Sequence, residues 1–113
     1  MTKYLFTEEG GEQWGWPGIE GVSLSTTTDF DFLSVSTVTV TGAHGPAVST
    51  FNDRAFAVVS GSGWFEVADN RFDVQPSNVV IVPKTTTYDF GSIDGMKVLI
   101  VDTPAYVEEE ESS

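Results

Sequence analysis

The chain has 113 residues, the length of one domain, and carries 5 basic against 17 acidic side chains for a net charge of −12. It contains no cysteine and one histidine, which excludes disulfides, thiol catalysis and sites built from several imidazoles. No apolar run is long enough to cross a bilayer, and so acidic a body would repel phosphate backbones and anionic lipids. We therefore expect a soluble, cytoplasmic protein that binds neither nucleic acid nor membrane.

The N-terminal segment 1–29 has the least regular pattern. Residues 8–20 hold four glycines, a proline and two tryptophans, which is typical of a loop or extension. We expect Trp14 and Trp16 either to pack on the domain that follows or to cover the mouth of a ligand pocket. The segment from Tyr4 to Phe6 could add a strand in a dimer.

Short alternating runs fill residues 30–106. The run from Phe30 to Thr41 predicts one long strand, or two strands joined by a bulge. Further runs, separated by turn residues, predict strands at 54–60, 64–68, 71–75, 78–82, 86–90 and 96–102. The acidic residues 107–113 are expected to form a disordered tail.

Composition supports the same fold class. Valine, isoleucine and threonine number 15, 4 and 13, whereas leucine and alanine number 4 and 6. Side chains branched at Cβ fit a pleated strand better than a helix, and no stretch shows the apolar spacing of a helix. Closely spaced strands predict an all-β antiparallel sandwich or barrel.

From Thr41 onward the chain resembles the cupin superfamily, whose members are small double-stranded β-helix (jelly-roll) barrels. The spacing of the first cupin motif is matched by Gly42, Val48, Thr50, Arg54 and Gly61. The spacing of the second motif is matched by Ser77, Pro83, Thr85, Tyr88 and Ser92. The resemblance covers residues 30–106 and implies a cupin-type barrel there.

The resemblance also implies a difference in chemistry. In the family, two histidines and a glutamate of the first motif and a histidine of the second hold a metal, and here Val48, Thr50, Arg54 and Tyr88 stand at those places. Valine cannot ligate, hydroxyls are poor ligands, and a guanidinium offers only donors and a positive charge. The substitutions predict a barrel with no metal and no cofactor, which removes metal-dependent oxygenase, isomerase and lyase chemistry.

His44 lies in the loop before this motif. It is either a surface residue or a residue that reaches the barrel mouth. A metal site made by His44 with Asp53 or Asp89 is the one remaining metal hypothesis.

Strand alternation, in the register of the family, predicts the barrel interior. It is mostly apolar and aromatic with one cation and two hydroxyls, as is usual for a small-molecule pocket. The predicted interior is Val48, Thr50, Arg54, Phe56, Val58, Phe65, Val67, Tyr88 and Phe90. The predicted ligand-binding residues are Val48, Thr50, Arg54, Phe56, Phe65, Tyr88 and Phe90.

Arg54 requires a partner if it points inward, because an unpaired buried guanidinium costs several kcal/mol. Asp53 and Asp89 face the other way on regular strands. Arg54 is therefore a candidate for binding a carboxylate or phosphate, with a rim-exposed salt bridge as the alternative.

Three functions stay open. The first is binding or sensing of a small anionic organic molecule of carboxylate, sugar or phosphate type. The second is a metal-independent isomerase or epimerase acting on a sugar or carboxylate, for which Tyr88 could donate a proton and His44 would have to serve as base. The third is a structural or assembly protein with a filled barrel.

We also expect a homodimer. Trp64 is predicted to point outward, where it would suit an interface. The alternative is that residues 8–20 of the same chain cover it.

Overall fold

The computed structural model describes residues 2–107, so the predicted acidic tail lies, except for Val107, outside the described residues. The described part of the chain contains no helix, and hence none that could cross a membrane. Its strands are β1 (Glu12–Trp16), β2 (Ile19–Ser23), β3 (Ser34–Val40), β4 (Asp53–Gly61), β5 (Gly63–Val67), β6 (Asn70–Val74), β7 (Val79–Val82), β8 (Tyr88–Gly91) and β9 (Met96–Thr103). The all-β prediction is confirmed.

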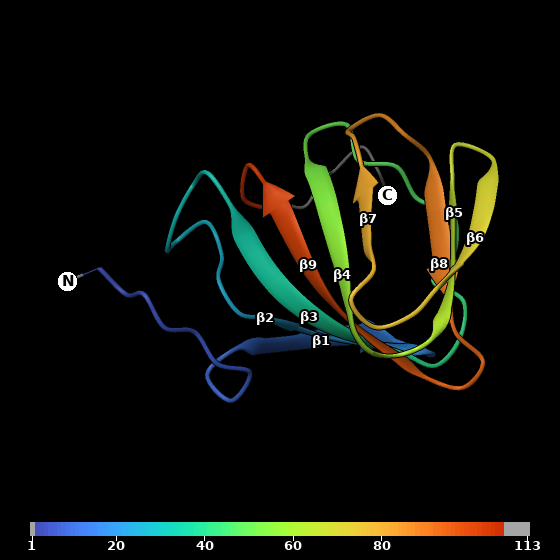
Figure 1. Ribbon diagram of the computed structural model, residues 1–113. Helices are drawn as coiled ribbons and strands as arrows, with labels where there is room; N and C mark the ends of the chain where they lie inside the picture. Colours follow the sequence, from blue (N-terminus) through green and yellow to red (C-terminus); the bar gives the residue numbers. More distant parts are fainter. Residues whose placement is uncertain (1, 108–113) are drawn as a thin grey trace.

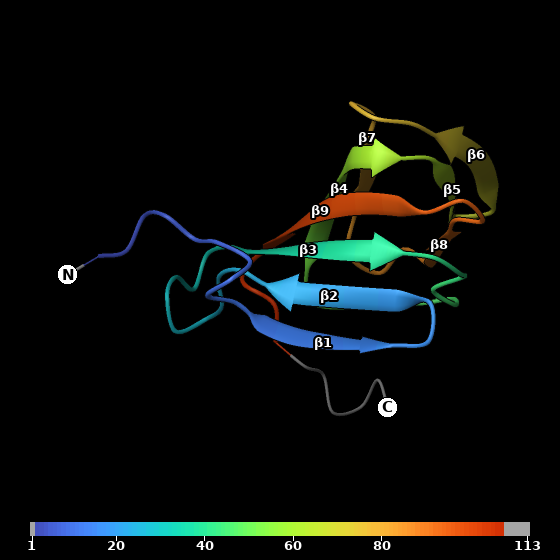
Figure 2. The same cartoon turned by 90° about the horizontal axis from the view of Figure 1, so that it is seen from below.

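The strands form two antiparallel sheets that enclose a barrel interior (Figure 1). The larger sheet has the order β1-β2-β3-β9-β4-β7, and Figure 2 shows most of these strands side by side. The smaller sheet has the order β6-β5-β8. The segment between β3 and β4 lies alongside β8, because Ala43 forms a β-bridge with Gly91 and Ala47 forms one with Tyr88.

Phenylalanines from both sheets fill the centre of the barrel. Phe56 of β4, Phe65 of β5 and Phe90 of β8 are fully buried, and the ring centroids of each pair lie 5.0 to 5.3 Å apart. Alternation explains this placement, because every second residue of each strand points inward. Six of the predicted strands, from residue 54 onward, correspond to β4–β9.

The segment from Phe30 to Thr41 differs from its prediction, because only Ser34–Val40 is a strand. The preceding residues form a turn in which the Asp29 carboxylate accepts a hydrogen bond from the Thr26 amide at 3.0 Å. Phe30 then packs its ring edge-on against Phe6. This local turn takes the place of ladder pairing at the start of the run.

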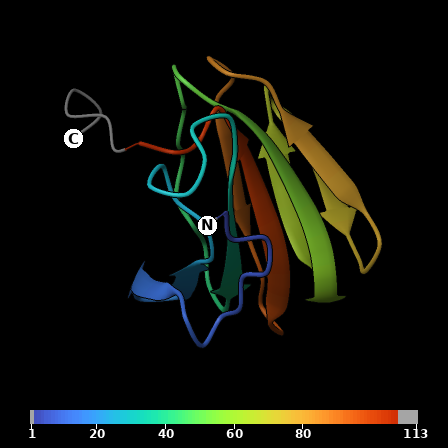
Figure 3. The ribbon, with the colours of Figure 1, turned by 90° about the vertical axis from the view of Figure 1, so that its left-hand side faces the viewer.

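The N-terminal extension contains two strands. Glu12–Trp16 and Ile19–Ser23 form a hairpin that extends the larger sheet, and Figure 3 shows it in blue at one side of the body. Gly18 makes the turn possible, with φ of +87°. Gly21 leaves room for the Trp14 ring, which a Cβ there would meet at 2.3 Å.

The phenylalanine core predicts a large cost for truncating Phe56. We expect Phe56→Ala to lower the free energy of unfolding by about 3–5 kcal/mol, because it leaves a cavity among three other rings. Phe32→Ala is the matched control, since Phe32 is 60% exposed, and it should cost less than about 1 kcal/mol. Urea unfolding followed by circular dichroism measures both, and equal losses would contradict this account of the core.

Candidate active site

A buried ion pair joins β4 and β9, which are neighbouring strands of the larger sheet. The register of β4 and β9 places Arg54 opposite Asp102. The Arg54 Nε donates to the Asp102 Oδ1 at 2.6 Å, and the two side chains are only 15% and 5% exposed. Arg54 therefore finds its carboxylate within the chain.

Tyr88 completes this arrangement from the smaller sheet. Arg54 Nη1 donates a hydrogen bond to the Tyr88 hydroxyl, and the Tyr88 ring packs against Phe56 at 5.7 Å between centroids. Burial raises the pKa of Tyr88 above its ordinary value, although the Arg54 charge opposes this. The phenol is therefore neutral at physiological pH and keeps a proton to donate.

In the Arg54–Asp102 pair, each residue stabilises the charged form of the other. Burial by itself would lower the pKa of Arg54, but Tyr88 and Asp102 outweigh it and raise that pKa above the ordinary value. Burial raises the pKa of Asp102, and Arg54 opposes the shift. A buried pair of this kind is costly to break, because the remaining partner is left charged and unpaired.

His44 lies on the segment between β3 and β4, which runs alongside β8, and its ring lies beside that of Tyr88. Its amide donates to the Phe90 carbonyl at 2.7 Å, and its ring stacks on Phe90 at 4.6 Å and on Tyr88 at 6.0 Å between centroids. The Gly45 amide donates to the Asp89 carboxylate at 2.9 Å, which fixes the loop. Of the two positions left open for His44, this half-buried one is the one that reaches the barrel interior.

The hydrogen bond of the His44 ring determines its tautomer. Nδ1 lies 2.8 Å from the Gly45 carbonyl oxygen, and a carbonyl only accepts, so Nδ1 carries the proton. The neutral ring therefore has its lone pair on Nε2. Burial lowers the pKa of His44 below 6.5 and Arg54 adds to this, whereas the Gly45 carbonyl and Asp89 oppose it.

The N-terminal hairpin places two tryptophans on the solvent side of His44. The Trp16 ring meets the His44 ring edge-on at 5.3 Å, and Trp14 lies 5.9 Å from Trp16. Trp16 is 46% exposed, so this side faces solvent. We call Trp16, His44, Arg54, Tyr88 and Asp102 the His44 cluster.

The structure brings most of the predicted site residues together. Five of them point into the barrel: Arg54, Phe56, Phe65, Tyr88 and Phe90. The other two, Val48 and Thr50, are exposed in the loop before β4. The prediction extended strand alternation back to residue 48, but regular strand begins at Asp53, and the Asn52 amide bonds to the Ser49 hydroxyl in a turn.

Asp102 is the site residue that the sequence reasoning missed. Alternation along β9 carries a signal for it, because Met96, Val98 and Ile100 point inward and Asp102 is the next residue in that series. The contact of Trp16 with His44 has no comparable signal, since it depends on where the hairpin lies.

The residues at the metal positions of the family do not fit a divalent cation. Arg54 occupies one of them and donates to both Tyr88 and Asp102, and Val48 and Thr50 are exposed in the loop before β4. Residues 2–107 contain no group of three or more histidines, aspartates or glutamates that could hold a metal ion. The Asp89 Oδ1 accepts hydrogen bonds from the backbone amides of Gly45 and Phe90, and the Asp53 Oδ1 accepts one from the Lys84 amide, so both carboxylates of the His44 metal hypothesis are engaged with the backbone.

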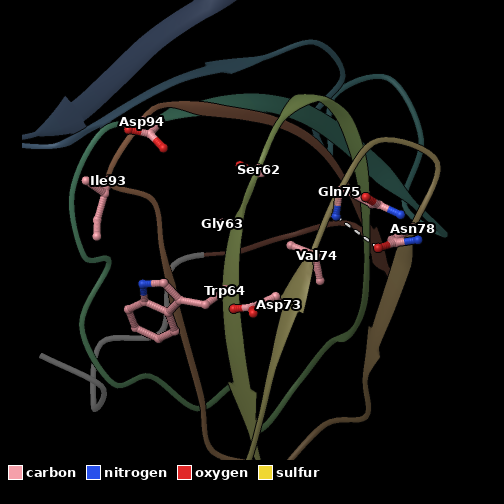
Figure 4. Close-up of a pocket in the computed structure, with 9 residues that line it drawn as sticks. All are labelled: Ser62, Gly63, Trp64, Asp73, Val74, Gln75, Asn78, Ile93 and Asp94. Atoms are coloured by element: carbon pink, nitrogen blue, oxygen red, sulfur yellow. Dashed lines mark hydrogen bonds between the residues drawn. The ribbon is translucent and has the colours of Figure 1, made fainter.

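A hollow of about 440 Å³ lies around Trp64, away from the His44 cluster (Figure 4). Ile93, Asp94 and Asp73 line it, together with Gln75, whose amide donates to the Asn78 side chain at 2.9 Å. The Arg71 guanidinium lies 3.9 Å from the centroid of Trp64. Trp64 thus points outward as predicted and is covered on one face by Arg71.

The fold matches solved cupin structures. A Streptomyces Pac13 variant with uridine is 26% identical, with a TM-score of 0.81 over 99% of this chain and 88% of that one. An RmlC-like cupin from Shewanella frigidimarina is 14% identical, with a TM-score of 0.80 over 93% of this chain and 96% of that one. The chain has the cupin fold. The predicted cupin-type barrel is confirmed.

A further Pac13 structure is described as a unique nucleoside dehydratase, and it is 25% identical with a TM-score of 0.81 over 98% of this chain and 88% of that one. No protein-family model and no curated protein sequence matches the chain. These likenesses support a cupin-like protein that binds a small molecule.

Burial of the single histidine predicts its titration. Proton NMR of the His44 ring should give a pKa below 6.5, because the charged form loses hydration among the rings. Since the folded pKa lies below the unfolded one, the contribution of His44 to stability is complete at pH above 6.5 and is lost as the pH falls through the folded pKa. A folded pKa at or above 6.5 would contradict the stacked, half-buried position.

Proposed function

We propose that this cupin is a metal-independent enzyme that binds a nucleoside-like molecule at the His44 cluster and moves a proton on it. The observation that carries the proposal is the His44 imidazole: its Nδ1 is bonded to the Gly45 carbonyl, and its ring stacks on the Tyr88 ring at 6.0 Å and meets the half-exposed Trp16 ring at 5.3 Å. Of the three functions that the sequence leaves open, this proposal corresponds to the metal-independent enzyme.

His44 supplies the base. A base acts best when its pKa lies near the working pH and its acceptor atom is available. The Gly45 carbonyl holds the Nδ1 proton, so Nε2 can take a proton from the substrate. The lowered pKa keeps the ring neutral at pH 7.

Tyr88 supplies a donor, and Arg54 positions it. The Tyr88 oxygen accepts from Arg54, which leaves the phenolic O–H free to point at a substrate oxygen. Donation from a guanidinium makes that O–H a stronger donor. Asp102 in turn holds the Arg54 guanidinium in place.

Two features select the class of ligand: the exposed Trp16 ring and the compensated charge of Arg54. The half-exposed Trp16 ring offers a surface on which a nucleobase can stack. Asp102 neutralises Arg54, and the whole chain carries −12, so an uncharged nucleoside is favoured over a nucleotide. The anionic ligand predicted from the sequence is therefore the less favoured class. The complex of the Pac13 variant with uridine supports the nucleoside.

The reaction class that fits is the elimination of water. Nε2 of His44 takes a proton from carbon, the C–H electron pair becomes a C=C bond, and the C–O bond to the neighbouring hydroxyl breaks. The leaving hydroxide takes a proton from the imidazolium or from Tyr88 and departs as water, so the atoms balance without a redox partner. The description of Pac13 as a nucleoside dehydratase supports this class.

A structural protein is the second candidate, because fully buried phenylalanines fill the barrel centre. In that case, the His44 cluster would bind no nucleoside. The two experiments that follow separate these candidates.

Stacking on Trp16 predicts a selective loss of binding. Isothermal titration with uridine should show binding by the wild type, and Trp16→Ala should weaken it by about 10-fold or more, because stacking on an aromatic ring contributes about 1–3 kcal/mol per base. Trp64→Ala is the matched control and should leave the affinity unchanged. Uridine 5′-monophosphate should bind less tightly than uridine. Tighter binding of the monophosphate would favour the anion-binding function, and no binding of either would favour the structural one.

If His44 is the base, its replacement should reduce turnover rather than binding. We expect His44→Gln to lower kcat by about 10²–10⁴-fold, because it removes the proton acceptor, with little change in the uridine affinity. Proton NMR of water loss from nucleosides that carry a carbonyl beside the reacting C–H bond measures this. Wild-type kcat/KM should fall as the pH drops through the folded pKa of His44. Unchanged turnover in His44→Gln would refute the assignment.

A further inference from the structure

Strand β7 is an edge strand of the larger sheet that lacks the usual protection of such edges. The sheet order ends at β7, and its residues, Val79–Val82, are all apolar. The other edge strands in residues 2–107 are protected: β1 carries Glu12, β6 carries Arg71 and Asp73, and the segment between β3 and β4 covers β8 through its bridges. Charges and covering segments prevent unwanted strand pairing. The edge of β7 is therefore open to an added strand.

The hydrogen-bonding pattern shows which backbone groups of β7 point away from the sheet. The carbonyl directly before β7 accepts a hydrogen bond from the Val58 amide of β4 at 2.9 Å. Hydrogen-bonded pairs recur at every second residue of an antiparallel ladder, so the next one joins Phe56 and Val80. The amides and carbonyls of the alternate residues, Val79 and Ile81, therefore point away from β4. Among the residues that the structure describes, no backbone hydrogen bond outside the paired strands involves these two.

A mostly apolar hollow of about 470 Å³ lies beside this edge, lined by residues of β5, β6 and β7. Phe72 of β6 lines it and is 39% exposed; its cross-strand partner Phe65 is buried in the core, so the Phe72 ring lies on the inner side of the sheet. A strand along β7 would alternate its side chains between this hollow and the outer surface. The hollow therefore selects apolar side chains at every second position of an added strand.

The charges around the edge select basic side chains for the other positions. The Asp53 carboxylate accepts from the Lys84 amide at 2.9 Å, so it lies at the C-terminal end of β7. Asp69 and Asp73 belong to the β5–β6 hairpin on the other side of the hollow. These carboxylates outnumber the cations of the same segments, Lys84 and Arg71. The whole chain carries −12, so a basic segment is attracted, whereas a second copy of this chain is repelled.

We propose that the free edge of β7 is a docking site for an extended segment of a partner protein in which apolar residues alternate with basic ones. The segment adds a strand to the larger sheet. Its backbone pairs with Val79 and Ile81, its apolar side chains enter the hollow beside Phe72, and its basic side chains lie on the acidic outer side. Backbone pairing supplies affinity, and the alternate side chains supply specificity. The inference does not depend on the proposed function.

Fluorescence anisotropy with a labelled nine-residue peptide of alternating valine and lysine tests this site. The wild type should bind the peptide. An N-methylated version has the same charge but cannot pair with the edge, so it should bind about 10-fold more weakly or worse. A version with glutamate in place of lysine should be weakened at least as much, because the acidic chain repels it. No binding of the valine–lysine peptide, or equal binding of the N-methylated one, would overturn the proposal.

Ile81→Pro and Ile81→Thr form a matched pair of variants. Proline is tolerated on edge strands, and at this position it removes an outward amide without removing a bond to β4. Ile81→Pro should therefore weaken binding of the valine–lysine peptide by about 5-fold or more. Ile81→Thr keeps the amide and should bind within about 2-fold of the wild type. Circular dichroism of both variants checks the fold, and equal affinities of the two folded variants would contradict backbone pairing.

Amide hydrogen exchange distinguishes the peptide from a second copy of the chain. In the free protein, the amides of Val79 and Ile81 should exchange fast, whereas those of Val80 and Val82, which bond to β4, should exchange slowly. The valine–lysine peptide should slow the first two. Slowing that needs only a higher protein concentration would assign the edge to a second copy. Slow exchange of Val79 and Ile81 at every concentration would mean that the edge is already covered, and either result would overturn the proposal.

Discussion

The ion pair between Arg54 and Asp102 sets the character of this barrel. It lies where β4 and β9 run side by side, and it places a permanent positive charge at a position where the cupin family has a metal-binding glutamate. Because Asp102 compensates that charge, the guanidinium can be buried and still direct a hydrogen bond to Tyr88. The same pair leaves the barrel interior close to neutral.

The two faces of the larger sheet have separate tasks in this account. The inner face holds the phenylalanine core and the ion pair, and the hairpin at its edge brings Trp16 to His44. The outer face presents uncharged side chains on β4 and β7, among them the exposed Val79 and Ile81. Alternation along β4 produces both, because Arg54 and Phe56 point inward while Ala55 and Ala57 point outward.

The alternation of inward and outward side chains also explains how much of the fold and the site could be predicted from the sequence. The strands from residue 54 onward and the inward positions of Phe56, Phe65 and Phe90 follow from local pattern, as does the closeness of Arg54 to Tyr88 once the cupin resemblance fixes the register. The exposure of Val48 and Thr50 did not follow, because a turn held by Ser49 interrupts the strand pattern. The pairing of Arg54 with Asp102 depends on the register between β4 and β9, and the stacking of His44 on Phe90 depends on a bridge between a loop and β8. Such long-range relations leave little trace in a single sequence.

A crystal structure of the protein grown with uridine tests the central claim most directly. We expect the nucleoside against Trp16 and His44, with a ligand atom within hydrogen-bonding distance of His44 Nε2 and with the Arg54–Asp102 pair intact. Uridine in the hollow around Trp64 instead, or a metal ion bound where the Arg54 guanidinium lies, would contradict the account.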